Sequence, residues 1–170
     1  IVGEVCHFVD FLSFLTGALP TNVRASAAPN GVAYNNDNVI LVIDFSDGSV
    51  GTIIYASNGD TSMAKERVEV FGGGSSAVLE NFRKLDTVRE GHTNTSRSRL
   101  SQDKGHQAQW QAFRNMVVGG AAPAIKFKEL VATTLTTFKA LESLRIGESV
   151  NINTDEYIAA VISGNAVDGD

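Results

Sequence analysis

The sequence contains little that is typical of a secreted, membrane-spanning or nucleic-acid-binding protein. It has one cysteine in 170 residues, so Cys6 cannot form an internal disulfide and gives no sign of an oxidising compartment. Its 14 basic side chains are outnumbered by 19 acidic ones, whereas a nucleic-acid binder needs a basic face. The longest aliphatic run, residues 39–43, is far shorter than the ~18 residues of a membrane span. The sequence also has no signal-peptide pattern. Together these features predict a mildly acidic, cytoplasmic globular domain.

The first residues lack the signals that normally begin a chain or a helix. The sequence opens at Ile1 without a methionine and runs directly into an amphipathic pattern. No Ser, Thr, Asp or Asn precedes that pattern to accept hydrogen bonds from the first helical N–H groups. We therefore expect the chain to be part of a longer protein that holds the rest of any active site.

Apolar periodicity predicts three helical segments. The first covers residues 3–15, where apolar side chains recur at three- and four-residue spacing and make most of the helix buried. The second covers about residues 105–118, with His106, Trp110, Phe113 and Val117 on one stripe. The third begins near Phe127 and ends at Gly147, which favours a left-handed C-cap. A further helical turn is possible at residues 157–162, and residues 164–170 look frayed.

The segments between these helices predict an open, largely antiparallel sheet of about five or six strands. Residues 39–45 and 49–56 form one hairpin across Ser46-Asp47-Gly48, whose residues tolerate a tight reversal. Residues 66–71 and 77–82 form a second hairpin, and residues 84–89 continue the meander. Residues 92–104 are polar and predict an exposed loop. The order helix, sheet, helices favours an α+β fold with helices on one sheet face.

The first predicted helix carries a polar cluster of Glu4, His7 and Asp10. Side chains three apart are helix neighbours, so either carboxylate is able to orient the imidazole and favour its charged form. An imidazole near neutral pH donates or accepts protons. The alternative interpretation is that these residues are only the polar edge of a buried helix.

Other motifs carry weaker signals. Asp103, Lys104, Gly105 and His106 enter the second helix, where free N–H groups can hold a hydroxyl-rich or anionic ligand, or where Asp103 simply caps the helix. The run Gly72-Gly73-Gly74 lacks both the dinucleotide and the Walker spacing and indicates a hairpin turn. The histidines show no zinc spacing, so no metal site is predicted. Arg97, Arg99 and Lys104 form a small basic cluster, which is more often a solvated loop than an anion site. Cys6 is interpreted as inert packing, and His92 has no visible partner in the sequence.

Five segments in the right order resemble one family. They are Gly-Glu-Val-Cys-His-Phe-Val-Asp at 3–10, Phe-Leu-Thr-Gly at 14–17, Glu-Arg-Val-Glu-Val-Phe-Gly at 66–72, Lys-Gly-His-Gln-Ala at 104–108, and Ala-Leu-Glu-Ser-Leu-Arg-Ile-Gly at 140–147. Together they resemble the C-terminal domain of the glucose-fructose oxidoreductase, inositol dehydrogenase and MocA (Gfo/Idh/MocA) family. The resemblance covers residues 1 to about 150, and residues 151–170 would form a partly frayed tail.

The resemblance implies a two-domain oxidoreductase that uses NAD or NADP, bound mainly by an N-terminal Rossmann domain outside this chain. Residues 1–150 would bind a sugar, nucleotide sugar or cyclitol and form a homo-oligomer through the open sheet face. His7 matches the family's catalytic histidine, which acts beside a lysine of the Rossmann domain. Glu4, Asp10, Lys104 and His106 would contact the substrate, and the chain alone is expected to be inactive.

One position departs from the family pattern. The family often places an aspartate four residues before this histidine, and here Gly3 stands there with Glu4 next to it. Glu4 is able to replace that carboxylate by a rotamer change, or this branch uses another helper. The rival interpretation of the whole chain is a non-catalytic ligand-binding or assembly module, because residues 39–45 are apolar on both sheet faces.

Overall fold

The computed structural model describes residues 1–29, 37–98 and 105–164, which fall into two compact units. The first unit combines Ile1–Asn58 with Ile125–Asp170, and the second is Gly59–Ala124. Each unit contains its own antiparallel sheet, and helices lie before, between and after the strands. The predicted α+β class is therefore confirmed.

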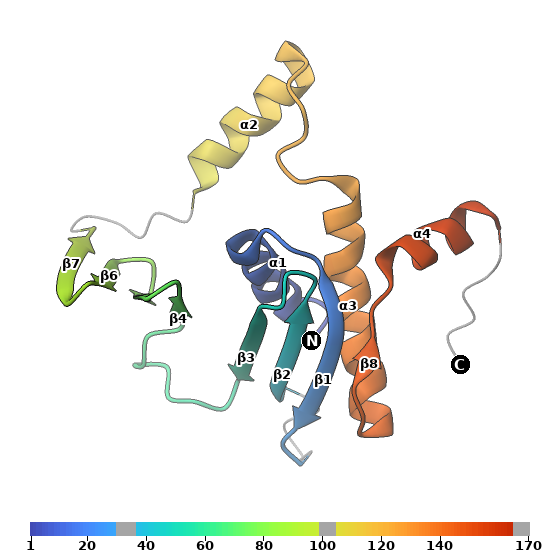
Figure 1. Ribbon diagram of the computed structural model, residues 1–170, viewed down its shortest axis with the longest axis horizontal. Helices are drawn as coiled ribbons and strands as arrows, with labels where there is room; N and C mark the ends of the chain where they lie inside the picture. Colours follow the sequence, from blue (N-terminus) through green and yellow to red (C-terminus); the bar gives the residue numbers. More distant parts are fainter. Residues whose placement is uncertain (30–36, 99–104, 165–170) are drawn as a thin grey trace. The chain divides into compact units, whose positions relative to one another are not determined.

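The first unit is a four-stranded sheet with two helices on one face (Figure 1). Its strand order is β3-β2-β1-β8, and all neighbours are antiparallel. The long helix α3 packs along β1, and α1 packs between α3 and β3. The elements are α1 (Val5–Thr16), β1 (Pro20–Ala27), β2 (Asn38–Phe45), β3 (Val50–Ala56), α3 (Phe127–Ile146), β8 (Val150–Asn151) and α4 (Thr154–Ile162).

The period-2 pattern of β2 shows which sheet face is covered. Its alternate residues are buried beneath the helices and make the centre of the core with Val23 and Ile53. On the other face Ile40 is 47% and Val42 40% exposed. Such alternation is expected for a sheet with helices on one side only. The buried residues of β2 are Val39, Leu41, Ile43 and Phe45.

The second unit is a separate meander with the strand order β4-β5-β6-β7. Its elements are β4 (Arg67–Gly72), β5 (Ser75–Glu80), β6 (Lys84–Arg89), β7 (His92–Arg97) and the helix α2 (His106–Gly119). Among the described residues, every buried side chain lies in the first unit. Within the described parts of the chain, no helix is both long and apolar enough to cross a membrane.

Two sequence predictions about the strands are corrected. The strands do not form one sheet, because β3 ends at Ala56 and the next strand, β4, begins a new ladder with β5. Residues 92–97 are not a loop but the edge strand β7, hydrogen-bonded to β6. Neither face of β7 is buried, so no apolar alternation marked it. The turn before it uses Glu90 and Gly91 with φ of 51° and 77°, as tight hairpins require.

The helical predictions are closer to the structure. α3 ends where expected, and Gly147 adopts φ 72° and donates its N–H to the Ser143 carbonyl at 2.8 Å. α4 begins earlier than the predicted turn, because the Asn153 side chain accepts a hydrogen bond from the Glu156 N–H at 3.2 Å. The expectation that most of the first helix is buried is wrong for Phe14, which is 78% exposed. Residues 165–170 lie outside the described part.

Candidate active site

Helix α1 is fixed firmly to the core on one side. Val5 and Val9 are fully buried, and the Phe8 ring lies 6.5 Å from that of Tyr55 on β3. At Gly51 a Cβ atom would stand only 2.7 Å from the Leu12 Cδ1 atom, so this glycine lets the helix approach β3 closely. A helix anchored by packing and by close approach to a strand is a rigid platform for the side chains on its other face.

The opposite face of α1 carries the predicted polar cluster. At 100° per residue, His7 lies about 200° from both Val5 and Val9 and therefore points away from the core. His7 and Glu4 are exposed, and Asp10 is half-buried. The imidazole is thus accessible to a ligand, which is the arrangement that the proposed acid-base role requires.

The three polar side chains are neighbours, although no direct contact holds them together. Glu4 and Asp10 each stand three residues from His7, a spacing that puts Cβ atoms about 5–6 Å apart. Among the described residues, neither carboxylate is hydrogen-bonded to the ring. Glu4 is the N-cap residue of α1, where the positive end of the helix dipole stabilises a carboxylate. A rotamer change at either residue is sufficient to orient the imidazole.

The remaining predicted site residues lie in the second unit or outside the described residues. His106 is exposed at the first position of α2, in the second unit. Lys104, Asp103 and Arg99 lie outside the described residues, so their predicted roles stay predictions. Arg97 ends β7 and is exposed, as is His92. Cys6 is a free, half-buried thiol.

The described residues do not form a dinucleotide site. The glycine run at 72–74 makes the turn between β4 and β5, as predicted, and is followed by a strand. A phosphate-binding glycine loop needs a helix after it, because the helix N-terminus supplies the N–H groups. Within the described ranges no group of three His, Cys, Asp or Glu side chains is placed to hold a metal ion. Among the described residues, the glycine run is thus a hairpin turn and not a phosphate-binding loop.

A hollow of the first unit is lined by other residues than this cluster. It has a volume of about 480 Å³ and lies between β1 and the C-terminal end of α3, with Arg24, Leu141 and Arg145 in its lining. It contains none of the predicted catalytic or substrate-binding residues. We give the α1 cluster more weight than this hollow, because the cluster combines an accessible proton-transfer group with neighbouring carboxylates.

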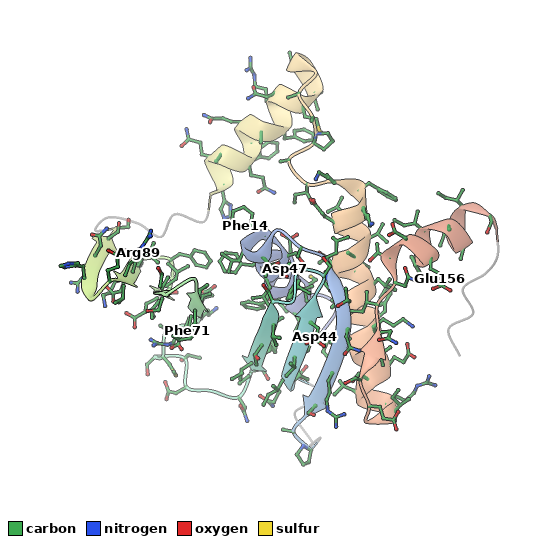
Figure 2. All side chains as sticks on the ribbon, viewed as in Figure 1. Phe14, Asp44, Asp47, Phe71, Arg89 and Glu156 are labelled. Atoms are coloured by element: carbon green, nitrogen blue, oxygen red, sulfur yellow. The ribbon has the colours of Figure 1, made fainter. Side chains whose placement is uncertain are left out.

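Sequence reasoning missed one exposed group on this face of α1. Phe14 projects from the helix into solvent, and its ring is stacked on that of Phe11 with centroids 6.5 Å apart (Figure 2). Apolar periodicity placed Phe14 with the core residues, because it cannot separate the edge of a buried stripe from its centre. The seven-residue spacing from His7 is the signal that links Phe14 to the polar face.

A family model and several solved structures are similar to this chain. The family model described as "Oxidoreductase family, C-terminal alpha/beta domain" matches residues 1–167. No curated protein sequence matches the chain. Several solved structures share its fold at low sequence identity, and three of them follow.

An aldose-aldose oxidoreductase from Caulobacter crescentus, complexed with glycerol, has a TM-score of 0.73 at 13% identity, with 86% of this chain and 45% of that one covered. Levoglucosan dehydrogenase, complexed with NADH and L-sorbose, has a TM-score of 0.74 at 17% identity. The match covers 89% of this chain and 50% of that one. UDP-N-acetylglucosamine 3-dehydrogenase from Acidithiobacillus ferrooxidans has a TM-score of 0.69 at 17% identity, with 82% and 45% covered.

This chain spans about half the length of these structures. The family match covers nearly all of its residues, and the helix-covered antiparallel sheet is shared with family members. The chain therefore belongs to the Gfo/Idh/MocA oxidoreductase family, as its C-terminal alpha/beta domain.

Proposed function

We propose that this chain is the substrate side of an NAD(P)-dependent oxidoreductase that oxidises or reduces a secondary alcohol of a sugar, nucleotide sugar or cyclitol. The observation that carries the proposal is the exposed His7 imidazole on an anchored helix, between two carboxylates, in a domain of this family. Polyhydroxylated ligands or substrates in the names of the similar structures support the substrate class.

The chemistry assigned to this chain is proton transfer. In the complete enzyme the nicotinamide would accept or supply the hydride. The hydroxyl proton must leave together with the hydride, so a base must lie within about 3 Å of that oxygen. His7 takes or returns this proton, beside the lysine that the family resemblance implies in the other domain. Glu4 or Asp10 holds the ring in the tautomer that presents a free nitrogen to the substrate.

Further substrate contacts are proposed at Lys104 and His106. Both belong to the approach to α2, where N–H groups at a helix start bind hydroxyl or anionic oxygens. In this proposal, the Rossmann domain of the complete enzyme binds the dinucleotide and supplies the lysine that acts beside His7. We therefore propose that the isolated domain binds substrate without turning it over.

The test is a His7→Ala substitution in the full-length enzyme. Loss of a positioned acid-base group lowers kcat by about 100- to 10,000-fold. His92→Ala is the matched control, because His92 is also exposed and lies on the edge strand β7. Turnover of His7→Ala within a few-fold of the wild type would remove the assignment, whereas the His92 variant should keep its rate.

A second candidate function is supported by the open face of the first sheet. Ile40 and Ile54 are paired across β2 and β3, and they are 47% and 74% exposed. Val42 and Val50 enlarge this apolar surface. Contiguous exposed apolar patches mark interaction surfaces. We propose that this face joins copies of the enzyme in a homo-oligomer, and a chain with only this role would be an assembly module.

A further inference from the structure

We infer that Phe14 is a specificity residue, which stacks on a second, uncharged ring of a glycoside whose first ring reacts beside His7. The inference rests on the proposed function. It begins with a large aromatic side chain that is 78% exposed on an otherwise well-packed helix. Exposing so much apolar surface is unfavourable, and a ring that is already held in place makes a good binding platform.

The Phe14 ring is held by its neighbour. Its plane is inclined by 27° to that of Phe11, in a stacked arrangement with centroids 6.5 Å apart. The adjacent residue Leu15 is only 41% exposed. Stacking on Phe11 leaves the outer face of the Phe14 ring open to a ligand and reduces the entropy that ligand binding would otherwise cost.

The spacing of the face sets the size of the ligand. His7, Phe11 and Phe14 follow the positions i, i+4 and i+7, which lie along one side of α1, and Glu4 precedes the helix as its N-cap residue. At 1.5 Å per residue, Phe14 lies about 10.5 Å along the axis from His7. A ring bound beside His7 is therefore separated from Phe14 by about two helical turns. A substrate with two linked rings spans them.

The charge of the face sets the kind of second ring. Helix α1 contains no lysine or arginine, and Glu4 and Asp10 are acidic. The diphosphate of a nucleotide sugar would therefore meet carboxylates without a basic partner on this helix, which is unfavourable. A neutral sugar ring has an apolar C–H face that packs on an aromatic ring. The helix thus favours a glycoside over a nucleotide sugar.

The test measures binding to the full-length enzyme, independently of turnover, by ligand-detected NMR titration. Cellobiose serves as a neutral two-ring probe, glucose as a one-ring probe, and UDP-glucose as a charged nucleotide-sugar probe. In Phe14→Ala we expect the dissociation constant of cellobiose to rise about tenfold, the usual effect of losing one ring stack, with that of glucose unchanged. Phe14→Trp should restore cellobiose binding, and Leu15→Ala is the matched control.

Several results would overturn the inference. These are an equal effect of Phe14→Ala on glucose and cellobiose, no effect on either, or no binding of cellobiose by the wild type. UDP-glucose binding that exceeds cellobiose binding and depends on Phe14 would contradict the charge argument. A changed oligomeric mass of Phe14→Ala would make the ring a protein contact instead. Failure of the proposed function is seen separately, because it would show as near-wild-type turnover of His7→Ala, whereas the effect of Phe14→Ala on cellobiose binding is measured without turnover.

Discussion

At the scale of single residues, Asp47 fixes the turn between β2 and β3 (Figure 2). Its carboxylate accepts hydrogen bonds from the Ser49 N–H at 3.0 Å and the Ser49 hydroxyl at 2.9 Å. These bonds favour the charged form and lower the pKa of Asp47 below its ordinary 3.8. Gly48, with φ 87°, completes the reversal that the sequence predicted.

This turn gives a pH-dependent prediction for Asp47→Asn. Because the pKa of Asp47 is lower in the folded than in the unfolded chain, its contribution to stability is present above pH 3.8 and is lost as the pH falls through the lowered pKa. We expect the wild type to be slightly more stable than the variant at neutral pH. That difference should disappear in acid, as measured by urea unfolding at several pH values.

Asp44→Asn is the control for this measurement. Asp44 is exposed on β2, the strand that leads into this turn, and among the described residues its side chain makes no hydrogen bond. A stability difference of Asp47→Asn that stays constant from neutral pH to strong acid would contradict the account of the turn.

The sequence was sufficient to predict which residues share the polar face of α1. Helical periodicity put Glu4, His7 and Asp10 together, and burial of Val5 and Val9 explains why that face is exposed. The exposure of Phe14 was not predictable, because apolar periodicity does not separate the edge of a buried stripe from its centre. The roles of these residues in catalysis stay predictions.

At the scale of elements, one buried hydroxyl joins α3 to two strands. Ser143 is fully buried, and its oxygen accepts a hydrogen bond from the Ala25 N–H on β1 at 2.9 Å. The same hydroxyl donates to the Glu148 carbonyl, just before β8. The short strand β8 pairs with β1 only at Asn22 and Val23. Beyond these residues, the Ser143 hydroxyl replaces β8 as the hydrogen-bond partner of β1.

Ser143→Ala should therefore make the protein less stable. The substitution leaves the buried Ala25 N–H without a partner, which lowers the free energy of unfolding by about 1–3 kcal/mol. Ser13→Ala on α1 is the matched control, since the buried Ser13 hydroxyl has no hydrogen-bond partner among the described residues. We expect that variant to be near neutral in a chemical denaturation series. Equal losses in the two variants would show that the bridge contributes nothing.

Elements with a strong local signal were predicted well, and those defined by pairing were not. The helix end at Gly147 and both hairpin turns follow from glycine and turn chemistry. Strand β8 is only two residues long, and β7 is polar on both faces, so neither has a periodic pattern. Their strand character comes from backbone hydrogen bonds to β1 and β6.

At the scale of the whole molecule, the open face of the first sheet is the surface that we propose to join copies of the enzyme. Ile54→Lys puts a charge at its centre, opposite Ile40. A buried, unpaired charge is strongly unfavourable, so the full-length variant should dissociate to smaller species in light scattering. Ile162→Lys on α4, where the isoleucine is 80% exposed, is the control and should keep the wild-type mass. An unchanged mass for Ile54→Lys would contradict the interface.

The central claim is that this domain brings a proton-transfer imidazole to the substrate. The most direct measurement is chemical rescue of His7→Ala in the full-length enzyme, with turnover followed while imidazole is added. The account predicts a rate that is lowered about 100- to 10,000-fold and then rises with imidazole concentration until it saturates, because the added base occupies the vacated position on α1. A variant that turns over at nearly the wild-type rate, or one whose lost rate imidazole does not restore, would contradict it.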